Sequence, residues 1–144
     1  SNFGAAAFKE ALSTATSTYF SVTVTPVAGN KVTLNSLNLG SRGTSTGPGK
    51  ITVYSSIDNY TTAIGTVNVS NNSTWTLNTI TFSGANLVGA ESAPVTLRIY
   101  GSDSPGAGTP SLGTANWRID DISLTPPILP LSVSFSKIIG GQVL

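Results

Sequence analysis

The chain has 144 residues, of which 9% are charged and 39% hydrophobic, and its formal net charge is only +1. This length is typical of one domain, and seven basic residues are too few to form the positive surface that follows a phosphate backbone, so nucleic acid is not an expected partner. The absence of His and Cys excludes Ser-His-Asp and Cys-His catalysis, ordinary zinc sites and disulfides.

The polar surface must be supplied mainly by Ser and Thr, because so few residues are charged. No stretch approaches the roughly 20 apolar residues that a membrane-spanning helix needs, so membrane insertion is not expected. The chain begins at Ser1 and contains no Met, which is typical of a mature secreted protein. We therefore expect a secreted location or the extracellular surface of a cell.

Apolar residues alternate with Ser and Thr along much of the chain, which is the period of a half-buried strand. Phe20, Val22 and Val24, for example, alternate with hydroxyl residues until Pro26 ends the run. In chain order, the runs that predict strands are 19–25, 32–39, 51–56, 64–69, 75–82, 95–100 and 117–124.

Two of these runs change phase. In the run 32–39 the change lies around Asn35, and a bulge there would keep both halves facing inward. In the run 75–82 the phase shifts between Leu77 and Ile80.

Both tryptophans are in phase with apolar neighbours on their strands. Trp75 shares its phase with Leu77, and Trp117 shares its phase with Ile119. We therefore predict that both indoles pack in the core rather than bind a ligand.

Short strands separated by turn signals, with almost no helical sequence, predict an all-β fold, namely an antiparallel β-sandwich of jelly-roll type. A parallel sheet would need crossover helices, for which the sequence has no signal. We assign residues 1–125 to this sandwich and residues 126–144 to a Pro-rich connector with a projecting strand.

The C-terminal segment predicts an extra strand. The prolines of 126–130 favour a stiff, extended connector, after which Leu131, Val133 and Phe135 alternate with Ser. A strand without a sequential partner must fold back onto its own sandwich or add to another subunit. The connector favours the second outcome, so the expected partners are copies of the same chain or adjacent domains of a surface protein.

Several segments resemble a jelly-roll module that is common in bacterial extracellular proteins. They are 19–26, the strand 51–56 with Asp58, 97–101 and 117–124. Modules of this type are similar to carbohydrate-binding jelly rolls and occur in secreted nucleases, adhesins and surface proteins. The segment 129–144 resembles the junction that precedes the C-terminal immunoglobulin-like region of type IX secretion cargo. These resemblances imply a β-sandwich, export from a bacterium and a glycan as a candidate ligand.

Asp120 and Asp121 form the only adjacent acidic pair. Ile119 and Ile122 are both apolar at a spacing of three, which predicts a bulge at the pair. The pair is a candidate site for structural calcium, because a hard cation prefers carboxylate and carbonyl oxygens. The alternative is that one Asp caps a loop and the other is solvated. No other cofactor is expected.

Catalysis has little support in the sequence. Glycoside hydrolysis needs two carboxyl groups on opposite sides of a sugar, whereas Asp58, Glu91 and Asp103 fall in loop-like sequence without a supporting pattern. We therefore do not expect an enzyme.

Sugar binding has a candidate face instead. Tyr54, Arg98 and Tyr100 lie out of phase with the apolar residues of their strands, so they can share one outward face. Sugar rings stack on such aromatics while polar groups bind the hydroxyls. The alternative is an ordinary sheet surface.

Two functions follow from these patterns. The first is a non-catalytic structural or adhesive module of the cell surface that assembles through its C-terminal strand. The low charge of the chain supports it, because closely packed contacts between subunits tolerate few unpaired charges. The alternative is a carbohydrate-binding module of a larger extracellular protein, supported by the resemblance and by the Tyr54, Arg98 and Tyr100 face.

Overall fold

The computed structural model describes residues 3–5, 11–83, 87–104, 115–126, 137–138 and 142–143. The strands of this part of the chain are β1 (Phe3–Ala5), β2 (Tyr19–Val24), β3 (Thr33–Leu34), β4 (Ser36–Gly43), β5 (Lys50–Ser55), β6 (Ala63–Asn68), β7 (Thr76–Thr81), β8 (Leu87–Val88), β9 (Val95–Ser102), β10 (Trp117–Thr125), β11 (Lys137–Ile138) and β12 (Gln142–Val143). One short 3-10 turn, η1 (Ser56–Asp58), follows β5. None of the described residues belongs to a helix of the length and hydropathy that crossing a membrane requires.

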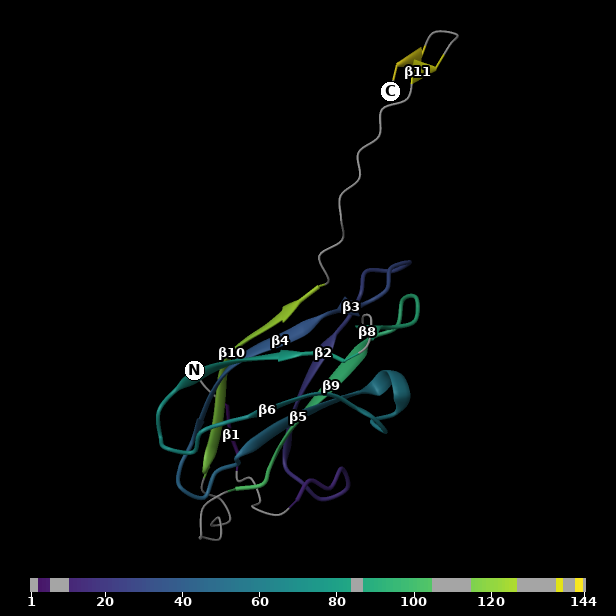
Figure 1. Ribbon diagram of the computed structural model, residues 1–144. Helices are drawn as coiled ribbons and strands as arrows, with labels where there is room; N and C mark the ends of the chain where they lie inside the picture. The colour runs from purple at the N-terminus through teal and green to yellow at the C-terminus, as the bar shows by residue number, and fades with distance from the viewer. Residues whose placement is uncertain are drawn as a thin grey trace.

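Two four-stranded sheets build the fold (Figure 1). Sheet 1 has the order β1-β10-β4-β7, and sheet 2 has the order β2-β9-β5-β6. Every strand pair of the described residues is antiparallel, and two short pairs among them, β3-β8 and β11-β12, lie outside these sheets. The predicted all-β antiparallel sandwich is confirmed.

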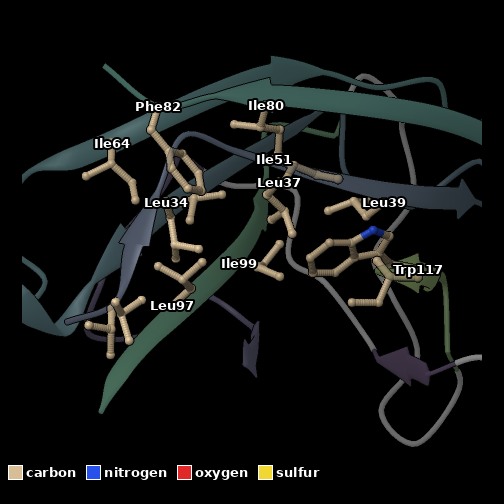
Figure 2. Packing of buried hydrophobic residues seen from close by; sticks show 14 residues of the cluster. Leu34, Leu37, Leu39, Ile51, Ile64, Ile80, Phe82, Leu97, Ile99 and Trp117 are labelled. Atoms are coloured by element: carbon tan, nitrogen blue, oxygen red, sulfur yellow. The ribbon is translucent and has the colours of Figure 1, made fainter. Parts of the chain in front are cut away.

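The core lies between the two sheets and is made almost entirely of aliphatic residues (Figure 2). Alternate side chains of a strand point to opposite faces, so each strand contributes every second residue. Sheet 1 supplies Leu37, Leu39, Ile80, Trp117 and Ile119, and sheet 2 supplies Ile51, Val53, Ile64, Leu97 and Ile99.

Trp117 is fully buried at one end of this core, as predicted (Figure 2). Its ring meets the edge of the Phe20 ring at a centroid distance of 4.8 Å, and its Nε1–H donates to Ser41 Oγ at 3.2 Å. A Cβ added at Gly101 would lie 2.8 Å from the indole. Glycine at this position is what allows the indole to pack directly against β9.

The change of phase around Asn35 is a break between two strands. β3 ends at Leu34 and pairs with β8, whereas β4 begins at Ser36 and belongs to sheet 1. Leu34 and Leu37 are nevertheless both buried, on either side of the break. The prediction that both halves face inward is confirmed. The chain achieves this by changing its strand partner between β3 and β4 rather than by a bulge within one strand.

The predicted phase shift in the run 75–82 is wrong, and so is the predicted burial of Trp75. Asn78, Ile80 and Phe82 face inward at a regular period of two, which places Leu77 on the outer face. Trp75 shares the phase of Leu77 and is 41% exposed.

The C-terminal segment is described only at β11 and β12, which pair with each other in a short antiparallel ladder. Leu131, Val133 and Phe135, together with most of the Pro-rich connector, lie outside the described residues.

Candidate functional site

A hollow on the outer face of sheet 1 collects an exposed tryptophan and two carboxylates. Gly40 from β4, Trp75 and Leu77 at β7, and Asp120 and Asp121 from β10 line a cavity of about 340 Å³. Gly40 pairs with both Leu77 and Asp120, so the three residues form one row across the sheet. Since glycine has no side chain, the row has a gap at its centre.

The Trp75 ring leans over this gap. A Cβ placed on Gly40 would lie 3.7 Å from Trp75 Cε3 and 3.4 Å from the Asp120 carbonyl oxygen. Both are ordinary van der Waals separations. The floor of the hollow therefore has room for a single methyl group without distortion of the backbone.

A β-bulge brings the two aspartates to the same hollow. The register between β10 and β4 shifts between Asp120 and Ser123, and Asp121 has a φ of +49°. Adjacent residues of a regular strand point to opposite faces, but the extra residue of a bulge re-aims a side chain. Asp121 N–H donates to Asp120 Oδ1 at 2.9 Å. The bulge predicted from Ile119 and Ile122 is confirmed.

Calcium at Asp120 and Asp121 stays a prediction. Calcium takes six to eight oxygen ligands, and the described residues contain no group of three or more acidic, His or Cys side chains placed to hold a metal. Further ligands at this pair would have to be carbonyl oxygens, hydroxyls or water.

All four tyrosines of the chain gather on the outer face of sheet 2, around Arg98. Arg98 lies opposite Tyr54 in the register of β5 and β9, and its guanidinium stacks 3.7 Å from the ring centroid of Tyr60 and 4.8 Å from that of Tyr19. The Tyr100 ring meets the rings of Tyr19 at 5.0 Å and Tyr54 at 5.5 Å. We call this group the tyrosine cluster.

The centre of the tyrosine cluster is closed. Tyr100 is fully buried, because the chain before β2 covers it and its hydroxyl donates to the Thr14 carbonyl oxygen at 3.1 Å. A hydrogen bond with the Tyr100 side chain raises the pKa of Arg98, so this side chain is charged at every pH of interest. Tyr54, Arg98 and Tyr100 thus share one face, but Tyr100 presents no surface to a ligand. Sugar binding by these three residues stays a prediction.

The isolated acids of the loops have local roles. Burial acts to raise the pKa of Asp58, but hydrogen bonds with Thr61 and Thr62 outweigh it and lower the pKa. Asp58 is therefore ionised at neutral pH and cannot donate a proton. Asp103 lies 3.4 Å from Lys50 in an ion pair.

Sequence reasoning missed Trp75 as a surface residue. The signal that could have found it is the unbroken alternation of Asn78, Ile80 and Phe82, which needs no phase shift if Asn78 is accepted as an inward residue. This alternation places a polar side chain, Asn78, in the core, which is unfavourable unless the side chain is hydrogen-bonded. Asn78 Nδ2 donates to the Thr76 carbonyl oxygen at 3.0 Å.

The sandwich thus carries aromatic side chains on both of its outer faces, at the hollow of sheet 1 and at the tyrosine cluster of sheet 2. Comparison of the chain with protein-family models, with curated proteins and with solved structures found no match. The two faces differ in openness, since Trp75 borders a cavity whereas the tyrosine rings pack on one another.

Proposed function

We propose that this chain is a non-catalytic adhesive module of a bacterial extracellular surface and that it binds carbohydrate in the hollow of sheet 1. The observation that carries the proposal is the exposed Trp75 ring beside two carboxylates in a cavity of about 340 Å³. Cavities of this size fall at the lower end of the range that holds small molecules.

The chemistry of the hollow matches that of a sugar ring. The flat face of an indole packs against the C–H face of a pyranose, and carboxylate oxygens accept hydrogen bonds from hydroxyls. Trp75 is the aromatic platform, and Asp120 and Asp121 are the acceptors. Gly40 lets the Trp75 ring lie close to the backbone of β4.

Trp75→Ala should weaken saccharide binding at least about tenfold, because one aromatic side chain that the ligand covers commonly contributes this much affinity to a small interface. The measurement is calorimetric titration of the full chain with oligosaccharides chosen from a glycan array. Tyr19→Ala is the matched control, since Tyr19 and Trp75 are equally exposed, at 41%, on opposite sheets.

The two variants separate the two aromatic faces. Loss of binding in Trp75→Ala alone supports the hollow, whereas loss in Tyr19→Ala alone would move the site to the tyrosine cluster. Gly40→Ala gives a second reading, because its methyl group fits the backbone but narrows the hollow. Unchanged affinity in both Trp75→Ala and Gly40→Ala would refute the hollow as the site.

A second candidate function is assembly through the C-terminal strand, and one feature of the sandwich supports it. Phe20, Val22, Ile119 and Ile122 line a largely apolar hollow of about 240 Å³. In the described part of the chain, β2 is an edge strand of sheet 2 and the pairing of β1 with β10 extends to Ile119. An apolar strand such as 131–135 from a second copy has both a groove and free backbone groups to meet there.

Truncation after Thr125 tests this assembly. If strand addition holds subunits together, the full chain should associate in sedimentation experiments and the truncated chain should be a folded monomer. A truncated chain that fails to fold would show that the strand belongs to its own sandwich. A full chain that stays monomeric at high concentration would also refute the proposal.

The strand orders of the two sheets support a jelly-roll arrangement for this module. In chain order, β1, β4, β7 and β10 fall in sheet 1, and β2, β5, β6 and β9 fall in sheet 2, so the chain crosses repeatedly between sheets. Eight antiparallel strands in two packed sheets are the general plan of jelly rolls. Secretion and a surface location follow from the same proposal.

A further inference from the structure

Two arginines lie directly opposite each other on the outer face of sheet 1, next to the hollow. Arg42 on β4 pairs with Arg118 on β10, two residues along each strand from the pair of Gly40 and Asp120. Residues two apart on a strand are about 7 Å apart on the same face. The arginine pair and the floor of the hollow are therefore within the span of a single disaccharide.

The arginine pair has no acidic partner in the described part of the chain. The one ion pair found there joins Lys50 and Asp103, and Arg42 Nε is a buried donor with no hydrogen-bond partner. Like charges directly opposite each other on neighbouring strands are destabilising, and an unpaired buried donor adds a cost. An anion bound between the two guanidinium groups would offset both costs.

The surroundings leave the pair accessible from the outer face. Both arginines are half-buried rather than covered. On its other side Arg118 pairs with Gly4 of β1, over which the Ala115 side chain lies. On the far side of Arg42, Ser73 N–H donates to the Gly43 carbonyl oxygen at 2.7 Å, so the chain before β7 runs beside the end of β4.

We propose that the hollow and the arginine pair form one site and that its ligand is an acidic saccharide, which deepens the function proposed above and rests on it. A sugar ring packs on Trp75, its hydroxyls donate to Asp120 and Asp121, and a carboxylate on the same or the next ring binds between Arg42 and Arg118. Guanidinium groups bind carboxylates with two parallel hydrogen bonds, which gives geometric selection as well as charge.

The site has a basic half and an acidic half, because a positive and a negative side chain follow each other along the outer face of β10. Arg118 and Asp120 lie on the same outer face, because the residues between and before them, Ile119 and Trp117, point into the core. A neutral sugar can use the acidic half of the site alone. An acidic sugar uses both halves, provided that its carboxylate lies toward the arginines and away from the aspartates.

The test compares a short oligogalacturonate with the neutral galactose oligomer of the same length, by calorimetric titration of the full chain. The acidic ligand should bind at least about tenfold more tightly, as expected for a charge-assisted pair. Arg118→Gln should remove most of this preference and leave the affinity for the neutral ligand within about twofold. Lys31→Gln is the matched control, since it removes one positive charge from an exposed position.

The salt dependence of the two affinities is a second test. The preference for the acidic ligand should shrink between about 0.05 and 0.5 M NaCl, because screening weakens the charge contribution, whereas the neutral affinity should stay nearly constant. A preference that falls equally in Lys31→Gln and Arg118→Gln would reflect only the net charge and would overturn the proposal.

The outcomes separate this inference from the proposed function. Binding of both ligands with equal affinity, lost in Trp75→Ala, overturns the acidic specificity and leaves the hollow as a sugar site. Binding of the acidic ligand that depends on Arg118 but not on Trp75 overturns the hollow and leaves an anion site at the arginine pair. Absence of binding to either oligomer overturns the acidic saccharide as the ligand, and absence of binding across the glycan array overturns carbohydrate binding altogether.

Discussion

Trp117→Ala should lower the free energy of unfolding by about 3–5 kcal/mol, the usual cost of removing a buried aromatic side chain. The indole is fully buried, packs against Phe20 and Gly101, and leaves Ser41 without its donor when it is removed. Such a loss is a large share of the 5–15 kcal/mol that stabilises a typical domain. Urea unfolding followed by far-UV circular dichroism is the appropriate measurement.

The chain supplies its own control for this variant, because its two tryptophans differ in burial. Trp75→Ala removes the same side chain from an exposed position, and we expect it to change the free energy of unfolding by less than about 1 kcal/mol. Equal losses in the two variants would contradict the assignment of Trp117 to the core and Trp75 to the surface.

Tyr100→Ala should also destabilise the fold by about 3–5 kcal/mol, although the residue lies on an outer face of a sheet. The ring is fully buried beneath the chain that precedes β2, between the rings of Tyr19 and Tyr54. Tyr100→Phe keeps the ring and removes only the hydroxyl that donates to Thr14, so it should cost about 1 kcal/mol.

The measurement for Tyr100 combines urea unfolding with hydrogen exchange. In Tyr100→Ala the amides of Thr16 and Ser17, which donate to the Ser13 carbonyl oxygen, and the amide of Gly101, which donates to the Thr18 carbonyl oxygen, should exchange faster than in the unaltered chain. A Tyr100→Ala variant as stable as the unaltered chain would show that the segment before β2 does not cover the ring.

The sugar-binding prediction from the sequence depends on the same residue. Period two correctly indicates that Tyr54, Arg98 and Tyr100 are out of phase with the core. It cannot indicate that residues 11–18 fold over one end of that face, because this cover comes from a segment without a strand pattern. Loss of sugar binding in Tyr100→Ala would therefore report damage to the fold rather than the removal of a contact.

The bulge at Asp120 and Asp121 was predictable for a local reason. Ile119 and Ile122 are both apolar and three residues apart, and a strand can bury both only if one residue is extra. The hollow beside the bulge was not predictable in the same way. It needs Gly40 of β4, Asp120 of β10 and Trp75, which directly precedes β7, and only the pairing of β4 with β7 and β10 brings them together.

The class of fold and most of the core can be predicted from residue types alone, because steric alternation along a strand is a local property. Which of the two faces of each strand is covered, and by what, depends on the tertiary structure. Trp75 is exposed because Ile80 and Phe82 set the phase of β7, and Tyr100 is buried because a loop covers it. Arg42 and Arg118, distant in the chain, become opposite neighbours through the register of two strands. Register depends on the summed packing of whole strands, which no single stretch of sequence contains.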